Sequence, residues 1–150
     1  AFALTGRYQD ALNDLNIWTA LRADATEYVY GKHVLYKDLL LSHYSADLAN
    51  EDHFINSRYN ASKFTATGDE LRFQKALILA ILDARKLEFL REGIRHFDIL
   101  RWFIPVYHAT ADGQRSELTP EDDRRVIQLP QVVSLSGVEQ NPWSNVGAWY

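Results

Sequence analysis

The feature that most constrains the fold is a run of seven apolar residues, Ala76 to Leu82, inside a long stretch of good helix-forming residues. A helix on a protein surface carries its apolar residues on one face, whereas this run is apolar on every face. The stretch predicts a helix from Asp69 to Glu92, which spans about 36 Å at about 1.5 Å per residue. We therefore expect a central helix that other helices surround.

Both ends of this helix carry recognisable signals. Thr67 and Glu70 have the spacing of a capping box, in which each side chain bonds the backbone of the other residue. Gly93 predicts a stop or a kink at the other end, because glycine weakens a helix by about 1 kcal/mol relative to alanine.

A second helix is predicted from Gly6 to Arg22. Its apolar residues recur at spacings of three and four, which places them on one face: Tyr8, Ala11, Leu12, Leu15 and Trp18. The string from Gly6 to Leu12 resembles the second helix of a tetratricopeptide repeat, although no second copy follows. A helical-repeat module for protein–protein interaction is therefore one alternative for the function.

The periodic pattern disappears between Asp24 and Thr67. Val34 to Leu41 predicts one short helix, and the rest predicts a long irregular connection. Helix signals fade again beyond Pro105, where Ala111 to Gln114 predicts a turn. Arg125 to Pro130 predicts at most a short extended segment.

Composition excludes several classes of protein. The chain has no cysteine, so it has no disulfide and no thiolate metal site. Its net charge is −4 and its basic residues alternate with acidic ones, so no nucleic-acid partner is expected. No apolar run approaches the roughly 20 residues that cross a bilayer. Since the sequence has no methionine and no signal peptide, we expect a fragment of a longer protein.

The densest polar cluster extends from Glu88 to Trp102. Glu88, Glu92 and His96 are spaced by four, but a metal-binding bundle needs a second set of ligands, so we expect no metal and no cofactor. Glu92 and Asp98 could also form an acid/base pair for glycosidic cleavage, so a glycoside hydrolase is a less favoured alternative for the function. No thiol nucleophile, glycine-rich phosphate loop or Gly-x-Ser-x-Gly motif is present, and we predict no enzyme.

The same cluster also contains a ladder of opposite charges, Arg95, Asp98 and Arg101. Residues three apart are neighbours on a helix, so such a ladder can hold a helix end against its surroundings. We favour this structural role for the three residues.

The cluster resembles a motif near the C-terminal end of SusD/RagB-type proteins, E-R-R-x-E-[apolar]3-E-G-x-R-[aromatic]-F-D-L-x-R-W. The residues that match in register are Arg85, Glu88, Glu92, Gly93, Arg95, Phe97, Asp98, Arg101 and Trp102. The departures are Ala84, Arg91 and His96. A second motif of the family, L-P-I-P-Q followed by Q-N-P, is matched by Leu129, Pro130, Gln131, Asn141 and Pro142.

The resemblance implies an all-α fold, mostly helical with long irregular loops and tetratricopeptide-related helices, of which residues 1–150 form the C-terminal portion. It implies a non-catalytic role in polysaccharide utilisation, binding a glycan or another nutrient at the cell surface. The implied partner is a SusC-like TonB-dependent transporter of the outer membrane. Members are lipoproteins anchored through an N-terminal lipidated cysteine, which these residues lack. The matching residues are implied to be a scaffold signature.

Ligand contacts, if this portion makes any, are expected in the stretch from Tyr28 to Phe64. Sugar rings stack on aromatic side chains, and the candidates are Tyr28, Tyr30, Tyr44 and Tyr59. Asn50, Asn56 and Asn60 could bind sugar hydroxyls. The alternative is that these rings only attach the loop to the helices.

Overall fold

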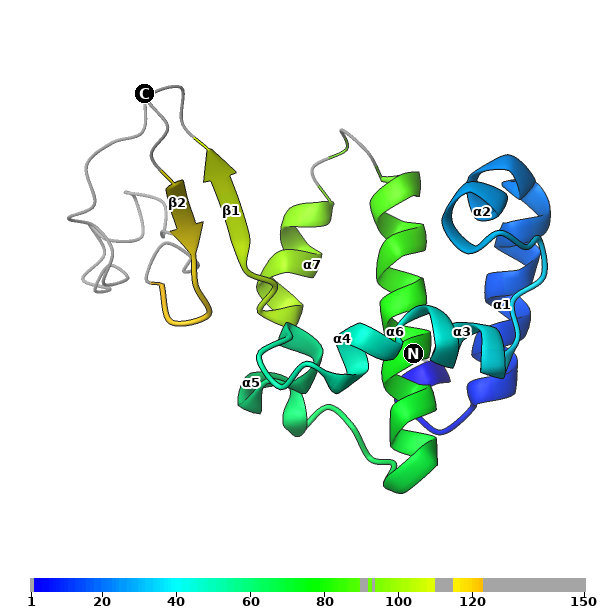
Figure 1. The fold of residues 1–150 in the computed structure, drawn as a ribbon, viewed down its shortest axis with the longest axis horizontal. Helices are drawn as coiled ribbons and strands as arrows, with labels where there is room; N and C mark the ends of the chain where they lie inside the picture. The colour runs from blue at the N-terminus through cyan, green and yellow to red at the C-terminus, as the bar shows by residue number, and fades with distance from the viewer. Residues whose placement is uncertain (1, 90–91, 93, 110–114, 123–150) are drawn as a thin grey trace, which may run out of the picture.

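The computed structural model describes residues 2–89, 92, 94–109 and 115–122, and within these ranges the chain is mostly helical (Figure 1). This confirms the expected all-α class. The elements follow one another as η1 (Phe2–Leu4), α1 (Tyr8–Leu21), α2 (Ala23–Tyr30), α3 (Lys37–His43), α4 (Ser45–Ala49), η2 (Phe54–Asn56), α5 (Arg58–Ala61), α6 (Gly68–Glu88), α7 (Arg95–Trp102), β1 (Val106–Ala109) and β2 (Arg115–Leu118).

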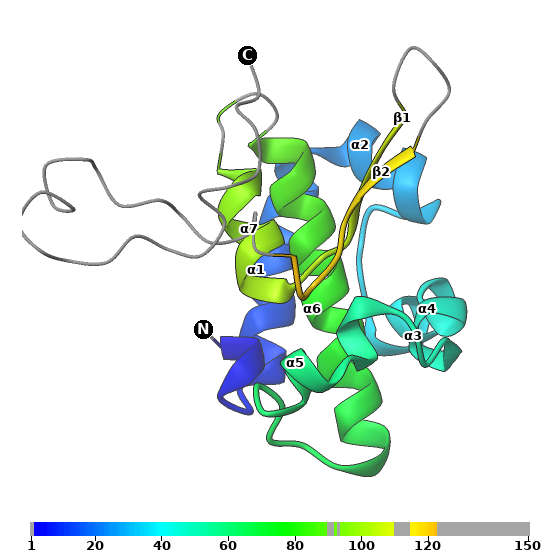
Figure 2. The ribbon, with the colours of Figure 1, turned by 90° about the vertical axis from the view of Figure 1, so that its left-hand side faces the viewer.

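Helix α6 is the centre of the fold, as its apolar run predicts. It lies between α1 and α7 in Figure 1, and α3 and α4 cross one of its sides. Figure 2 shows that η1 and the N-terminus lie on the opposite side. Six residues of the run are buried, and the seventh, Ile81, is half-buried.

The ends of α6 differ from the sequence prediction. The helix stops at Glu88, four residues earlier than expected, and Gly93 lies outside the described residues. Thr67 is the N-cap residue, but its side chain makes no capping hydrogen bond, so the predicted capping box is wrong. Gly68, with a φ of +60°, allows the turn into the helix that a side chain would strain.

Helix α1 confirms the periodicity analysis. Ala11, Leu12 and Leu15 are buried on the predicted face. The Tyr8 ring makes an edge-to-face contact with Phe73 of α6, with ring centroids 5.9 Å apart. The pattern of α1 therefore reports packing against a helix that is distant in the sequence.

The prediction of an irregular connection between Asp24 and Thr67 is wrong. The segment contains α2, α3, α4, η2 and α5, all of them short. The expected helix at Val34–Leu41 is present as α3, shifted to Lys37–His43. These helices are too short for a periodic signal, and contacts with distant residues hold them: the Asn16 side chain bonds both the N–H of Leu35, at 2.8 Å, and its carbonyl oxygen, at 2.9 Å.

A two-stranded antiparallel hairpin that the sequence analysis did not predict follows α7. Val106 pairs with Leu118, and Ala109 pairs with Arg115. The predicted turn at Ala111–Gln114 and the predicted extended segment at Arg125–Pro130 lie outside the described residues.

Candidate functional site

The four tyrosines that were candidates for ligand contact lie in very different environments. Tyr28 is 92% exposed on α2. Tyr30 and Tyr44 are buried, and Tyr59 is half-buried on α5. The four are therefore not equivalent, although their role in ligand binding stays a prediction.

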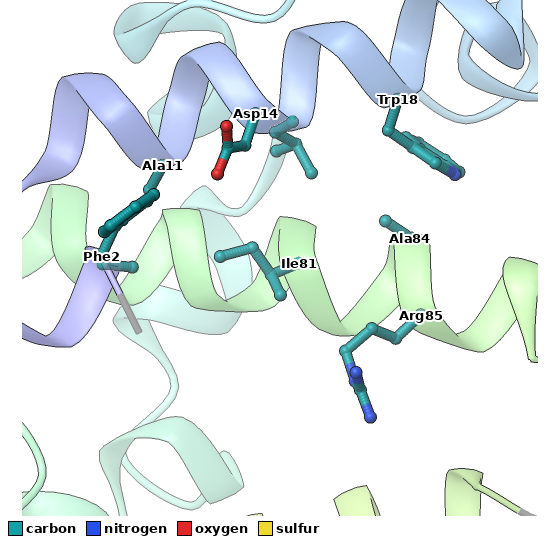
Figure 3. A pocket seen from close by; sticks show the side chains of 9 residues that line it. Phe2, Ala11, Asp14, Trp18, Ile81, Ala84 and Arg85 are labelled. Atoms are coloured by element: carbon teal, nitrogen blue, oxygen red, sulfur yellow. The ribbon is translucent and has the colours of Figure 1, made fainter.

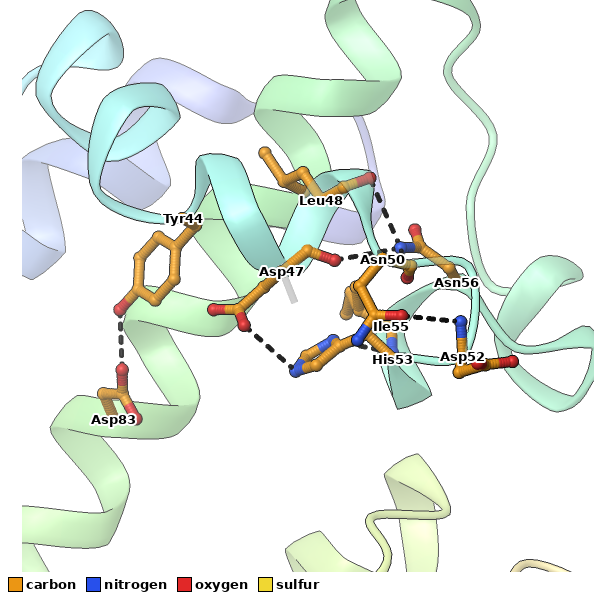
Figure 4. A network of polar contacts seen from close by, with 9 residues as sticks. All are labelled: Tyr44, Asp47, Leu48, Asn50, Asp52, His53, Ile55, Asn56 and Asp83. Carbon is orange, nitrogen blue, oxygen red and sulfur yellow. Dashed lines mark hydrogen bonds and ion pairs between the residues drawn. The ribbon is translucent and has the colours of Figure 1, made fainter.

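Tyr30 and Tyr44 belong to a buried chain of hydroxyl groups. Their oxygens lie 2.9 Å apart, and the Tyr44 hydroxyl donates to the Asp83 carboxylate on α6 at 2.7 Å (Figure 4). Burial raises the pKa of Tyr30 to about 12 and raises that of Tyr44 further, because a phenolate there would lose its hydration. The two hydroxyls therefore join the C-terminal ends of α2 and α3 to the central helix.

Tyr59 has its ring in a stack of four side chains. The ring stacks on Phe103, with centroids 5.0 Å apart, and the Arg58 guanidinium lies 5.0 Å from its centroid. The Tyr59 ring is therefore in contact with an aromatic ring and with a cation. The Lys63 ammonium lies 5.0 Å from the Phe103 centroid, and the Tyr59 hydroxyl donates to Glu121. With Phe103 and Arg58 against its ring and its hydroxyl bound to Glu121, Tyr59 is less exposed than Tyr28, and its role in ligand binding stays a prediction.

Five of the large apolar side chains that are exposed lie on α1, on α2 or in the segment after α2. They are Ile17, Leu21, Tyr28, Val34 and Tyr36. Val34 and Tyr36 flank Leu35, which the two hydrogen bonds to Asn16 fix against α1 beside Ile17. Tyr28 and Tyr36 are thus the two exposed tyrosines between Tyr28 and Phe64. Tyr36 was not predicted as a ligand contact, because its exposure depends on the burial of its neighbour Leu35.

The three asparagines proposed as partners for sugar hydroxyls form hydrogen bonds with backbone atoms of the protein. The Asn56 side chain donates to the carbonyl oxygens of Asp47 and Asn50, at 3.0 and 2.7 Å, and closes the turn after α4 (Figure 4). The Asn50 side chain accepts from the N–H of Asp52 at 3.0 Å. Burial lowers the pKa of the neighbouring His53, whose Nδ1 accepts the N–H of Ile55 at 3.4 Å.

Asn60 has the largest structural role of the three. It is completely buried, and its side-chain amide donates to the carbonyl oxygens of Phe54, at 2.8 Å, and Trp102, at 2.7 Å. The Lys63 ammonium donates to the carbonyl oxygen of Arg101 at 2.6 Å. A cation is favourable at the negative end of a helix, so Asn60 and Lys63 together cap the C-terminus of α7.

The signature residue Glu88 ties the end of α6 to α1. Its carboxylate accepts from the Arg22 guanidinium, at 2.9 and 3.2 Å, and from the Trp18 indole N–H, at 3.1 Å. These hydrogen bonds, chiefly that of Arg22, lower the pKa of Glu88. Glu92 is exposed beyond the helix end.

Asp98 joins α7 to α6 through Arg85, a partner that was not predicted. The Arg85 Nε lies 3.0 Å from both carboxylate oxygens of Asp98, and the Arg95 guanidinium lies 4.0 Å from one of them. Arg101 makes no ion pair with Asp98, so the predicted ladder is wrong in that member. The interhelical pair forms because Asp98 lies on the face of α7 that packs against α6, which buries its side chain to 5% exposure.

The remaining signature residues divide between core and surface. Trp102 is buried, whereas Phe97 on α7 is exposed. Gly93 and the tail motif, Leu129, Pro130, Gln131, Asn141 and Pro142, lie outside the described residues.

A hollow of about 260 Å³ opens between α1 and α6. Figure 3 shows Phe2 at one end and Trp18 at the other, with Ile81 and Ala84 on the α6 side. The Asp14 side chain points into the gap between the helices. The hollow is mainly apolar and was not predicted from the sequence.

The described residues contain no group of three or more histidine, aspartate or glutamate side chains arranged to hold a metal ion. None of their helices is long and apolar enough to cross a membrane.

Comparison with known proteins identifies the family. A family model for the SusD family matches residues 21–141, which is most of the chain and includes the whole segment from α2 to α7. Searches of curated protein sequences and of solved structures gave no match. The match confirms the resemblance carried by the residues of α6 and α7. The chain belongs to the SusD family, whose role is the binding of nutrients such as glycans at the cell surface.

Proposed function

We propose that the chain is the C-terminal portion of a non-catalytic, lipid-anchored protein of the outer membrane. This protein holds a glycan or another nutrient and delivers it to a SusC-like TonB-dependent transporter. The observation that carries the proposal is the match to the SusD family over residues 21–141. The helical fold around α6 agrees with it.

The arrangement of the carboxylates supports binding without catalysis. A glycoside hydrolase needs two carboxyl groups that face the substrate, one of them able to release a proton. Asp98 is buried, and its side chain is engaged by Arg85 and Arg95 in the joint between α6 and α7, so it does not face a substrate. Glu92 is exposed beyond the end of α6. We therefore assign Asp98 to the scaffold.

We assign ligand contact in this portion to Tyr28 and Tyr36, because Tyr30, Tyr44 and Tyr59 have their hydroxyls or ring faces occupied by the protein. Tyr28→Ala and Tyr36→Ala in the full-length protein should each weaken glycan binding by about 1 kcal/mol or more in calorimetric titrations. Tyr107→Ala is the matched control, since Tyr107 on β1 is as exposed as Tyr36, at 49% against 50%. Unchanged affinity in both test variants would place the ligand elsewhere in the protein.

Delivery to a transporter has its own test. The native protein, tagged at its C-terminus and extracted from outer membranes with mild detergent, should co-purify with a TonB-dependent transporter in near-equal amount. Recovery of the protein without a transporter, or from a soluble fraction, would contradict the delivery step while leaving nutrient binding open to the titrations.

A further inference from the structure

The segment from Gly31 to Tyr36 links α2 to α3 and carries the exposed Tyr36 ring. It begins where Gly31 ends α2 in the left-handed conformation, with a φ of +66°, and it ends where Tyr36 precedes α3 as its N-cap residue. Among the described residues, no backbone–backbone hydrogen bond involves residues 32–35. The position of the segment therefore depends on contacts with side chains.

Asn16 on α1 supplies the main contact. Its amide nitrogen donates to the Leu35 carbonyl oxygen at 2.9 Å, and its amide oxygen accepts the Leu35 N–H at 2.8 Å. We call this pair of hydrogen bonds the Leu35 clamp. Leu35 is only 1% exposed, so its backbone groups depend on Asn16 rather than on water. His33 adds contacts with the Ala23 carbonyl oxygen at 3.2 Å and the Glu27 carboxylate at 3.7 Å, but both lie on the surface, where water competes with them.

The Leu35 clamp determines where the Tyr36 ring lies. Burial alternates along the three residues: Val34 is 64% exposed, Leu35 is buried and Tyr36 is 50% exposed. The backbone of Tyr36 is extended, with φ −143° and ψ 164°, and successive side chains of an extended chain point to opposite sides. Holding Leu35 against α1 therefore holds the Tyr36 ring toward solvent.

Tyr28 needs no such clamp. It belongs to α2, whose Thr26 and Tyr30 are buried, and the Tyr30 hydroxyl lies 2.9 Å from that of Tyr44. The helix turns Tyr28 to solvent whatever the segment after it does. An effect of Asn16 on ligand binding should therefore pass through Tyr36 and not through Tyr28.

We propose that Asn16 is a positioning residue for nutrient binding, which holds the Tyr36 ring where a sugar stacks on it and does not touch the sugar. The proposal rests on the nutrient contact assigned above to Tyr36. Asn16 precedes residues 21–141, so the match to the family assigns it no role. The sugar site thus depends on a side chain of α1 that lies 20 residues before the ring it places.

Titration calorimetry of the full-length protein tests the proposal. The probe is the neutral oligosaccharide that the unmodified protein retains most tightly from a labelled mixture of gluco-, xylo-, manno- and galacto-hexaoses. Asn16→Ala should weaken binding by about threefold or more, and by no more than Tyr36→Ala does. Asn16→Asp keeps an acceptor for the Leu35 N–H but loses the donor to the Leu35 carbonyl oxygen, and it takes the place of Asn16→Ala if that variant does not fold.

Combined variants show which ring Asn16 acts on. In a Tyr36→Ala background, Asn16→Ala should change the dissociation constant by less than about twofold, because the ring that it places is already absent. In a Tyr28→Ala background, it should weaken binding by the same factor as in the unmodified protein.

Gln74→Ala is the matched control for loss of stability. This buried side chain of α6 also bonds a backbone carbonyl oxygen, that of Ala3 at 2.8 Å, and a backbone N–H, that of Ala66 at 3.4 Å. Its removal should lower the melting temperature but leave the affinity of the folded protein unchanged within about twofold. Hydrogen exchange followed by mass spectrometry checks the clamp itself: Asn16→Ala should speed exchange in the peptide that contains Leu35 by about tenfold or more, and Gln74→Ala should not.

The outcomes separate this role from the nutrient contact on which it rests. If Tyr36→Ala weakens binding and the Asn16 variants do not, Asn16 is not a positioning residue, while the nutrient contact stands. Unchanged exchange at Leu35, an equal effect of Asn16→Ala with and without Tyr36, or an equal loss of affinity in Gln74→Ala would also overturn the role. If Tyr36→Ala leaves affinity unchanged, or if no oligosaccharide of the mixture is retained, the contact and the positioning role are both overturned, and nutrient binding by the family stays open to peptides.

Discussion

Replacing Asp98 by alanine tests the joint between α6 and α7. The carboxylate accepts the Arg85 Nε with both oxygens at 3.0 Å, and its side chain is only 5% exposed. Alanine would leave the Arg85 and Arg95 guanidinium groups close together without the anion that separates them. The expected result is a loss of stability.

The structure bounds the size of this loss. A hydrogen bond to a charged group contributes about 1.5–3 kcal/mol, and breaking a fully buried ion pair costs about 3–5 kcal/mol. Arg85 keeps 36% of its side chain exposed, so water can solvate part of its charge once the partner is removed. We therefore expect Asp98→Ala to lower the free energy of unfolding by about 2 kcal/mol, and the milder Asp98→Asn by about 1 kcal/mol.

The assay is chemical denaturation followed by circular dichroism, with thermal melting as a second measurement. For a domain of this size, about 2 kcal/mol lowers the Tm by about 4–8 °C. Asp14→Ala is the control: this exposed aspartate lies within α1, where alanine is the better helix former, so stability should stay the same or rise slightly. If Asp98→Ala is as stable as the control, or if it abolishes nutrient binding while remaining fully stable, Asp98 is not a scaffold residue.

Two other predictions concern buried polar groups. Asn60→Ala should lower the free energy of unfolding by about 2–4 kcal/mol in denaturant titrations, because the carbonyl oxygens of Phe54 and Trp102 lose their buried donor. Asn50→Ala on the surface should lower it by less than about 1 kcal/mol. Equal losses in the two variants would show that Asn60 does not cap α7. Burial raises the pKa of Tyr30 to about 12 from an ordinary value of 10.0, so the folded state favours the neutral phenol. Its contribution to stability is complete below about pH 10 and is lost as the pH rises toward 12. Tyr30→Phe should flatten this decline in the free energy of unfolding, and an identical slope in both proteins would contradict the assignment.

The sequence predicted the helices whose pattern of apolar residues repeats within the helix itself. Helices α1 and α6 are long enough for apolar residues to recur several times, so their faces and approximate bounds follow from periodicity. The Trp18 and Glu88 side chains were singled out separately, but their hydrogen bond joins residues that are 70 positions apart. No spacing rule within one helix can reveal such a pair.

Apart from α3, the short helices between α1 and α6 were missed for the same physical reason. Their stability depends on distant side chains, as Asn16 shows for the segment around Leu35 and Asn60 shows for the end of α7. Asp98 is similar, because the pattern of α7 offered Arg95 and Arg101 as partners while packing brought Arg85 to it. Sequence spacing identifies neighbours on one helix, and tertiary contacts then decide among them.

For ligand contact, the sequence offered only a region, and that region stays a prediction. The sequence selected the stretch from Tyr28 to Phe64 for its rings, but ring count does not distinguish an exposed tyrosine from a buried one. Tyr28 and Tyr30 are two residues apart, and the helix turns Tyr28 to solvent and Tyr30 to the core. Exposure, which decides whether a sugar can stack, depends on the packing of α2.

The central claim is that the protein binds a nutrient without changing it. Equilibrium dialysis of the native full-length protein against labelled oligosaccharides and peptides, followed by mass spectrometry of the recovered ligands, tests this claim most directly. We predict saturable retention of at least one ligand, recovered with its mass unchanged. Retention of none of them, or recovery of shortened products, would contradict the account.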